Sequence, residues 1–463
     1  MAFNDPLVRL GDYVEACLGK MLDAQKNRGA FQPYLGNSNV RWGAFDLQDL
    51  AVMRFEQQEE ERYGLRDGDL VVCEGGEPGR CAIWQGEVPN MKIQKALHRI
   101  RVKDGLDNYF LYYWFLHAGK TESLEPYFTG TTIKHLTGKA LAELKIPLPP
   151  IERQRGLAKV LRSLDDKIDL NRRINQTLEA MAQAIFKSWF VDFDPVKAKI
   201  AAIEQGQDPL RASMRTISGK TDAELDQMPR EHHDQLAATA ALFPDEMEES
   251  ELGEIPKGWA VNTLGSVTNY LSRGISPKYL ENGGVLVLNQ KCIRDFRVDE
   301  SKGRRHDPTQ RKIDGRALEL GDVLINSTGV GTLGRAAQVR CLNEPTIVDS
   351  HVTVVRASHE LNASYLGQYI IWKQPNIEAM GEGSTGQTEL SRVKLAELPV
   401  LTPRENLLKV FDNLISPLNN EISANDRESV KLAKLRDTLL PKLLSGELSV
   451  SDAGKLADTT GAA

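Results

Sequence analysis

The chain has 463 residues, of which 41% are hydrophobic and 26% charged, and its formal net charge is −6. This length exceeds what one hydrophobic core serves, and the composition is that of a folded rather than a disordered protein. No run approaches the roughly 20 apolar residues that cross a bilayer, and the N-terminus lacks the pattern of a signal peptide. We therefore expect two or more globular units in the cytoplasm, with no membrane partner.

The cysteines and the charge distribution narrow the possible functions only a little. Five cysteines are scattered without a Cys-x-x-Cys pair, which suits a reducing compartment and argues against a zinc ribbon or a disulfide scaffold. No metal site is predicted. Residues 196–255 hold 13 acidic and 6 basic residues, whereas residues 91–103 hold five basic residues and no acidic one. Because the rest of the chain is slightly basic, its charge neither establishes nor excludes a nucleic acid as partner.

An internal repeat determines the predicted architecture. The tetrapeptide Leu-Ala-Glu-Leu occurs at 141–144 and again at 395–398, an offset of 254 residues. The same offset pairs Leu10 with Leu264 and Leu136 with Leu390, and the matches continue in order along roughly half the chain. We interpret the chain as two copies of one module.

Each copy begins with a globule that mixes short strands and helices. Residues 1–150 and 256–403 alternate short apolar runs with Gly, Asn and Pro turns, as at 70–72 and 323–325. Denser aromatic segments at 109–116 and 365–372 predict short helices. The expected fold class is α+β, with two similar globules separated by two long helices.

Each globule is followed by a long helix, at 151–195 and at 404–446. Positions 164, 168, 171, 175 and 178 and their counterparts 254 residues later follow a 4-3 spacing, which is typical of a coiled-coil seam. Asn171 and Asn425 occupy the same seam position in both copies, where a buried asparagine fixes register. We predict an antiparallel intramolecular coiled coil with a pseudo-twofold repeat; the alternative is that each helix packs only on its own globule.

Two further segments complete the domain organisation. Residues 196–255 are acidic and rich in Ala, Gln and Met, and we predict a solvated helical insertion or linker there. Residues 447–463 are predicted to form a flexible tail.

This layout resembles the specificity subunit of type I restriction–modification enzymes along essentially the whole chain. The resemblance depends on four segments taken together: Leu-Pro-Pro-Ile-Glu-Arg-Gln at 148–154, Trp-Phe-Val-Asp-Phe-Asp-Pro at 189–195, Gly-Glu-Ile-Pro-Lys-Gly-Trp at 253–259, and Leu-Leu-Ser-Gly-Glu-Leu at 443–448. The long acidic insertion departs from the family pattern and leaves the path between the domains open.

The resemblance implies a function and a set of partners. Each globule would be a target-recognition domain that reads one half of a split double-stranded DNA site. The helices would set the spacing and dock two adenine methyltransferase subunits, and restriction (motor–nuclease) subunits would then join. The chain itself would have no catalytic residues and no cofactor, while S-adenosylmethionine, ATP and Mg would be bound by the partner subunits. The sequence agrees, since it contains no Asn-Pro-Pro-Tyr or Asp-Pro-Pro-Tyr motif and no phosphate-binding Gly-Lys-Ser/Thr loop.

Candidate DNA-binding residues follow from the chemistry of base recognition. Arg and Lys pair with guanine, and Asn and Gln pair with adenine, through two hydrogen bonds. The candidate base readers are Asn37, Asn39, Arg41 and Arg80 in the first globule and Asn289, Gln290, Lys291 and Arg335 in the second. Candidate phosphate ligands in loops are Thr131 and Lys134 in the first copy and Thr385 and Gln387 in the second. For each of them the alternative is a solvent-facing turn residue.

Four aromatic residues close the first long helix: Phe186, Trp189, Phe190 and Phe193. They have two possible roles. They could fill the core where the helix meets a globule, or they could form a docking surface for the methyltransferase, since aromatic residues are enriched at interfaces.

Two other classes of function remain as alternatives. Residues 329–334 (Gly-Val-Gly-Thr-Leu-Gly) formally match a dinucleotide-binding motif, which would make the protein an oxidoreductase if a helix followed. The motif requires a helix N-terminus at the pyrophosphate, and the proline at 345 comes too soon for a crossover helix. A coiled-coil scaffold that binds only protein is the other alternative.

Overall fold

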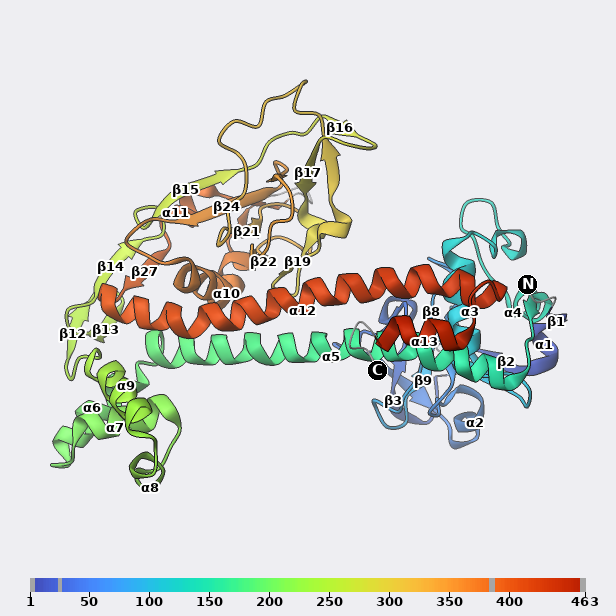
Figure 1. The fold of residues 1–463 in the computed structure, drawn as a ribbon, viewed down its shortest axis with the longest axis horizontal. Helices are drawn as coiled ribbons and strands as arrows, with labels where there is room; N and C mark the ends of the chain where they lie inside the picture. Colours follow the sequence, from blue (N-terminus) through green and yellow to red (C-terminus); the bar gives the residue numbers. More distant parts are fainter. Residues whose placement is uncertain (1–4, 24–26, 383–387, 459–463) are drawn as a thin grey trace. The chain divides into compact units, whose positions relative to one another are not determined.

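The computed structural model describes residues 5–23, 27–382 and 388–458. The chain divides into two compact units, one formed by Met1–Asn171 with Arg427–Ala463 (unit 1) and the other by Arg172–Asp426 (unit 2). Each unit contains one globule and one stretch of each of two long helices, α5 (Ile151–Phe190) and α12 (Glu405–Ser445) (Figure 1). Among the described residues, no helix is both long enough and apolar enough to cross a membrane.

The globule of unit 1 is built on a four-stranded antiparallel sheet. Its strand order is β2 (Val14–Leu18), β10 (Leu97–Val102), β7 (Leu70–Cys73), β8 (Cys81–Ile83). All four residues of β7 are buried, which is why this strand is a continuous apolar run rather than an alternating one. Helix α3 (Asn108–Lys120) begins at Asp107, whose side chain accepts a hydrogen bond from the backbone N–H of Phe110, and packs on the sheet.

Smaller sheets complete this globule. A three-stranded sheet has the order β6 (Val52–Phe55), β3 (Ala30–Leu35), β9 (Lys92–Ile93), with β3 and β9 parallel. Strand β1 (Leu7–Arg9) pairs with β11 (Lys145–Pro147) next to the short helix α4 (Gly138–Glu143). The β1–β11 pairing brings together the beginning and the end of the segment that forms this globule.

Unit 2 repeats the same arrangement with different residues. Its main sheet has the order β15 (Thr268–Arg273), β24 (Val352–Ala357), β21 (Val323–Asn326), β22 (Ala336–Gln338). A second sheet has the order β16 (Tyr279–Leu280), β20 (Arg304–His306), β17 (Val285–Leu288), β23 (Thr346–Val348), and β17 runs parallel to β23 as β3 does to β9. The counterparts of β1, β11, α3 and α4 are β14 (Ala260–Thr263), β27 (Pro399–Thr402), α10 (Ala363–Ala379) and α11 (Arg392–Ala396).

Side-chain contacts repeat along with the topology. In unit 1 Arg101 Nε donates to Asp69 Oδ1 at 2.8 Å, and in unit 2 Arg356 Nε donates to Asp322 Oδ1 at 2.6 Å. Both aspartates are buried at the turn before the central strand. The prediction of two copies of one α+β module is therefore confirmed.

Helices α5 and α12 run antiparallel within each unit. In unit 1 Asn171 Nδ2 donates to Glu428 Oε2 at 2.6 Å and to Ser429 Oγ at 3.4 Å. In unit 2 Asn425 Nδ2 donates to Asn175 Oδ1 at 2.9 Å. Since Asn171 corresponds to Asn425 and Asn175 to Ser429 across the repeat, the two contacts are equivalent. The seam predicted from the 4-3 spacing is thus the packed face, and its polar positions bond across the helix pair.

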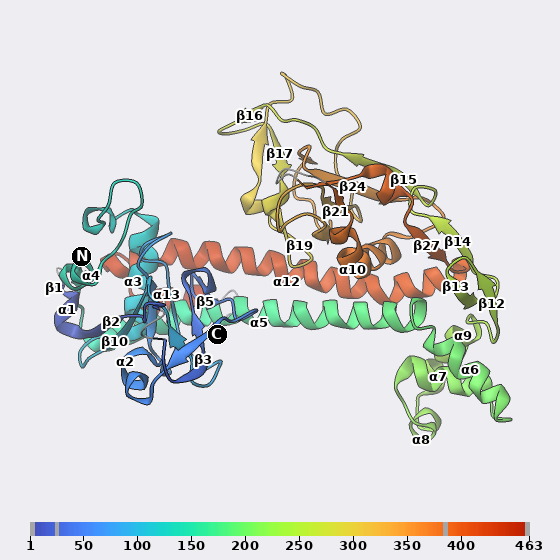
Figure 2. The same cartoon turned by 180° about the vertical axis from the view of Figure 1, so that it is seen from behind.

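The segments after the long helices are also helical. Four short helices, namely α6 (Asp194–Glu204), α7 (Pro209–Ser218), α8 (Asp222–Asp226) and α9 (Arg230–Ala241), lie together beside the end of α5 (Figure 2). Helix α13 (Val450–Asp458) packs on the start of α5, where a Cβ on Gly156 would lie 3.0 Å from Val450 Cγ1. Because Ala453 and Ala457 are buried, the prediction of a flexible tail at 447–463 is wrong for residues 450–458.

Candidate nucleic-acid interface

Three loops meet at one edge of the first globule. The loop at 74–80 follows β7, the helical turn η1 (Asn37–Asn39) follows β3, and a third loop spans 129–135. Arg80 Nη2 donates to the backbone oxygen of Asn37 at 3.0 Å, and the N–H of Leu136 donates to the oxygen of Glu74 at 2.7 Å. Glycine is favoured at position 76 because its φ is +74°, and a Cβ there would lie 2.6 Å from Asn37 Nδ2.

The candidate base readers of unit 1 differ in how free their side chains are. Asn39 is used within its own turn: its Oδ1 accepts from the Gly36 N–H at 2.9 Å and its Nδ2 donates to the Asp46 oxygen at 2.9 Å. Arg41 has a side chain 41% exposed and is paired with Asp46 at 3.2 Å. Arg80 is only 17% exposed and is paired with Glu77. Arg41 is therefore more exposed than Arg80, although its Nη1 also donates to the Ser38 backbone oxygen, and Asn39 is a turn-stabilising residue.

The same loops meet in unit 2. Gln290, at the start of η4 (Gln290–Cys292), takes the place of Asn37, and its Oε1 accepts from Thr332 Oγ1 at 3.2 Å. The backbone oxygen of Arg335 accepts from the Asn326 N–H at 2.9 Å, just as that of Arg80 accepts from Cys73 at 2.8 Å.

Asn289 and Lys291 complete this cluster in different ways. Asn289 caps its turn by accepting from the Lys291 N–H at 2.8 Å and donating to the Lys302 oxygen at 3.0 Å. The Lys291 side chain is exposed. As in unit 1, the asparagine stabilises a turn and the cation faces solvent.

Hydrogen bonds across a turn align the two clusters residue by residue. The N–H of Asp46 donates to the Asn39 oxygen, and the N–H of Asp299 donates to the Cys292 oxygen, each at 2.7 Å. The offset in this stretch is thus 253 residues, so the counterpart of Arg41 is Arg294. Both arginines end a short strand before a tight turn, β4 (Val40–Arg41) and β18 (Ile293–Arg294).

The candidate phosphate ligands are described only in unit 1. Thr131 and Lys134 are both exposed on the loop at 129–135. Lys134 forms an ion pair with Glu125, and its Nζ lies 5.9 Å from the centre of the Phe128 ring. Thr385 and Gln387 lie outside the described residues.

The structure adds polar residues at this edge that the sequence reasoning missed. In unit 2 Thr328 Oγ1 lies 2.8 Å from His351 Nδ1, and Arg273 is paired with Glu389 and donates to the Leu390 oxygen at 2.8 Å. Glu389 stands 254 residues after His135, which occupies the same loop in unit 1. The repeat offset could have identified this exchange of an imidazole for a carboxylate.

Local basic charge was a poor guide to the interface. Of the cations at 91–103, Lys92, Arg99 and Arg101 are largely buried and paired with the carboxylates of Glu60, Glu15 and Asp69. These pairs stabilise the globule and do not face solvent as a basic patch.

The aromatic residues at the end of α5 lie in the core of unit 2. Phe186, Trp189 and Phe190 are 2%, 3% and 4% exposed. The Phe190 ring lies 4.9 Å from that of Tyr365 and 5.0 Å from that of Phe411, and Phe193 packs on Trp259 at 5.8 Å. Their prediction as a partner-docking surface is wrong, because the side chains fill the junction between α5 and the second globule.

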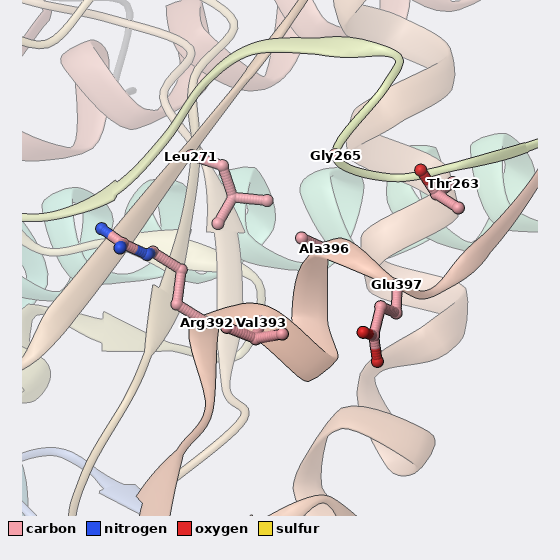
Figure 3. A pocket seen from close by; sticks show the side chains of 7 residues that line it. All are labelled: Thr263, Gly265, Leu271, Arg392, Val393, Ala396 and Glu397. Atoms are coloured by element: carbon pink, nitrogen blue, oxygen red, sulfur yellow. The ribbon is translucent and has the colours of Figure 1, made fainter.

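Neither the glycine motif nor the hollow in unit 2 forms a small-molecule site. Residues 329–334 connect β21 to β22 as an antiparallel hairpin, so no helix N-terminus follows the loop. A hollow of about 380 Å³ is lined by Thr263, Gly265, Leu271, Arg392, Val393, Ala396 and Glu397. Arg392 and Glu397 point away from each other there (Figure 3), whereas ligand sites have converging polar groups. The corresponding surface of unit 1 carries the Arg9–Glu143 ion pair at 2.7 Å.

Comparison with known proteins gives these loops a context. Residues 7–180 match the family model described as the type I restriction modification DNA specificity domain. The chain is 29% identical over 341 residues to the type I restriction enzyme HindI specificity subunit of Haemophilus influenzae, covering 68% of this chain and 72% of that protein. It is 26% identical over 368 residues to the MjaIX specificity subunit of Methanocaldococcus jannaschii, covering 78% and 74%.

A solved structure shares the same family name. The crystal structure of the type I restriction–modification S subunit from M. genitalium is similar with a TM-score of 0.49 and 16% identity, over 95% of this chain and 96% of that one. The assignment rests on the sequence matches. Residues 7–180 therefore match the type I restriction modification DNA specificity domain, and most of the chain is similar to type I restriction enzyme specificity subunits.

Proposed function

We propose that the two globules each read one half of a split double-stranded DNA target, using the loop edges described above. The proposal rests on one observation: the two units repeat the same backbone scaffold but present different side chains on its loops. Equivalent backbone hydrogen bonds hold the loops of both units, at Leu136–Glu74 in one and Leu390–Ser327 in the other. The polar groups presented there differ, with Asn37 in place of Gln290 and His135 in place of Glu389.

The chemistry of these groups suits base recognition. An exposed arginine such as Arg41 or Arg294 can donate two hydrogen bonds to guanine, and a carboxylate such as Glu389 can accept from the amino group of cytosine. Exposed lysines such as Lys134 and Lys291 suit phosphates, which position a protein on DNA without reading its sequence. Different residues on one scaffold would read different sequences in the two half-sites.

The protein acts in this proposal as a non-catalytic member of a larger assembly in the cytoplasm. Two methyltransferase subunits and the restriction subunits would bind this chain and carry the chemistry. S-adenosylmethionine, ATP and Mg would be held by those partners. The resemblance to type I specificity subunits and the absence of the methyltransferase and phosphate-loop motifs from the sequence support this division.

Replacing one globule tests the proposal. Residues 1–148 are exchanged for the first globule of another family member, and the complex with methyltransferase is assayed on a library of split sites. One half of the preferred target should change while the other is retained, and replacing residues 256–403 should change the opposite half. A change of both halves in either chimera contradicts the two-reader model. A parent complex that binds no DNA instead favours a scaffold that binds only protein.

A further inference from the structure

The second globule is attached to the long helices through a buried ion pair. Arg340, which follows β22, pairs with Glu179 of α5, and the two side chains are only 9% and 10% exposed. Arg340 Nε also donates to Asn419 Oδ1 of α12 at 2.9 Å, and Ser423 Oγ donates to the Arg340 backbone oxygen at 3.2 Å. Glu179 makes no hydrogen bond to compensate for loss of Arg340 within the described part of the chain.

A second charged contact lies one helical turn further along α12. Arg297, in β19 (Arg297–Val298), pairs with Asp426. Asp426 also accepts from Asn175 Nδ2 of α5 at 2.8 Å, so the globule and both helices share this carboxylate. Burial raises the pKa of Asp426, and the nearby Arg297 and Arg340 act in the opposite direction. The two arginines therefore favour the charged form of this carboxylate.

The first globule is attached by different charges. Asp165 of α5 accepts from Arg436 Nη1 of α12 at 2.6 Å and from the Tyr113 hydroxyl of α3 at 2.7 Å. Lys120, at the end of α3, pairs with Asp437 of α12 at 2.5 Å. Helix α3 thus contacts the long helices of unit 1 through the Tyr113 hydroxyl and the Lys120 ammonium, and Asp165 is shared by α3, α5 and α12.

None of these charges is preserved across the repeat. At the offset of 254 residues, the counterpart of Glu179 is Ala433, that of Asp426 is Arg172 and that of Arg436 is Ala182. Asp165 corresponds to Asn419, and Gln85 stands in the first globule where the second has Arg340. The contrast is sharp, because the sheet contacts and the asparagine contacts of the coiled coil are duplicated.

This asymmetry has a direct energetic consequence. If the first globule docked on the α5 surface that holds the second, Gln85 would face Glu179 and leave a buried carboxylate without a cation. Breaking a buried pair by removing one partner is strongly destabilising, whereas replacing both partners by apolar residues often is not. Charges arranged in this way penalise the wrong pairing more than they stabilise the right one.

We propose that the Arg340–Glu179 and Arg436–Asp165 clusters are docking keys, which restrict each globule to its own stretch of helix and set the orientation of its reading loops. The proposal rests on the proposed function, since it concerns how each reader is positioned. These are positioning residues that act through the loops and touch no base. When globules are exchanged between relatives, the match of these helix residues would determine how much base discrimination the new globule keeps.

The test uses the full chain in complex with methyltransferase. The double variant Glu179→Leu/Arg340→Met removes both charges and is expected to fold. Base discrimination at the second half-site should fall by about tenfold, equal to the loss of roughly one bidentate base contact. Spacers one base pair longer or shorter should become acceptable, while discrimination at the first half-site is unchanged. Asp165→Leu/Arg436→Met should give the mirror result.

Two further variants make the outcome decisive. Glu405→Leu/Lys409→Met applies the same chemical change to an exposed pair on α12 and should alter neither half-site. Arg340→Lys keeps the positive charge and should retain most of the base discrimination. This variant still tests the proposal if the double variant fails to fold. Unchanged discrimination in the double variant, equal loss at both half-sites, or a loss in Arg340→Lys as large as in the double variant would overturn the proposal. A parent complex with no base discrimination would instead refute the proposed function.

Discussion

At the scale of single residues, the candidate side chains divide between turns and solvent. The side-chain amides of Asn39 and Asn289 form hydrogen bonds with backbone atoms, as asparagine commonly does in turns. Arg41 keeps its side chain 41% exposed beside Asp46. Because Asp46 holds the guanidinium in place and the side chain is still partly exposed, Arg41 is the better candidate for reading a DNA base.

We predict that Arg41→Ala relaxes the preference at one base pair of the first half-site. One bidentate contact accounts for about 1–3 kcal/mol of discrimination. Lys134→Ala should weaken cognate and scrambled DNA alike and lower the salt slope by about one. Binding of single-base variants at several salt concentrations measures both effects. Uniform weakening by Arg41→Ala would identify this residue as a phosphate ligand.

We predict that a buried histidine makes the stability of unit 1 depend on pH. His98 is 1% exposed, and its Nε2 lies 2.9 Å from the Leu136 oxygen. Burial lowers the His98 pKa below its ordinary value of 6.5, although the Leu136 carbonyl and Glu74 act in the opposite direction. Below about pH 6.5 the unfolded chain therefore binds more protons at this site than the folded chain does.

The free energy of unfolding should accordingly fall as the pH is lowered from 7.5 to 5.5, and His98→Gln should reduce that dependence. Glutamine can still donate to the Leu136 oxygen but does not titrate. Urea unfolding of both proteins across this range measures the difference in slope. Equal slopes would show that the histidine is protonated as readily in the folded state.

At the scale of elements, the periodic patterns predicted most of the fold. The apolar runs at 70–72 and 323–325 are central strands, and the 4-3 spacing identified the packed face of both long helices. Such patterns are visible because each is local and dictated by burial of one face.

The missed features depend on contacts between distant residues. Helix α13 is held by two alanines, Ala453 and Ala457, whose burial no local pattern signals. Arg41 could be matched with Arg294 only from the hydrogen bonds across the two turns. The sequence does not reveal that the repeat offset changes by one residue there, because the two loops have dissimilar sequences. The aromatic group at 186–193 had two readings in the sequence, and its contacts with Tyr365 and Phe411 decided between them.

The asparagine contacts of the coiled coil are predicted to fix its register. Replacing both residues (Asn171→Leu/Asn425→Leu) should raise the melting temperature, since apolar groups replace polar ones in the seam, but make the pairing less unique. Size-exclusion chromatography should then show exchange between chains or aggregation. Gln176→Leu, on the exposed face of α5, is the matched control. A monodisperse double variant with an unaltered target spacer would show that the asparagines do not set register.

At the scale of the whole molecule, the proposed function makes the helix pair a ruler for the DNA target. The opposed heptads 170–176 and 424–430 correspond across the repeat, so deleting both keeps the remaining seam in phase. Seven residues of helix rise about 10 Å, and base pairs are stacked about 3.4 Å apart. The preferred spacer should shorten by about three base pairs, or binding should be lost.

Selection of bound sites from a library with variable spacers measures this change. Because the deletion also removes the asparagine contacts, Asn171→Leu/Asn425→Leu serves as the control of unchanged length. An unaltered spacer in the deletion variant would mean that the helices do not determine the distance between half-sites.

The discontinuity of unit 1 bears on how the protein is made. Its core includes Leu432, Leu439 and Leu443 of α12, and these leave the ribosome only after the whole of Arg172–Asp426. At about 5–20 residues per second, the first globule waits about 10–50 s for the helix that closes its core, whereas the second is contiguous and closes as it emerges. The half synthesised first is completed last, and during that interval its uncovered apolar face is the part of the nascent chain that most needs a chaperone.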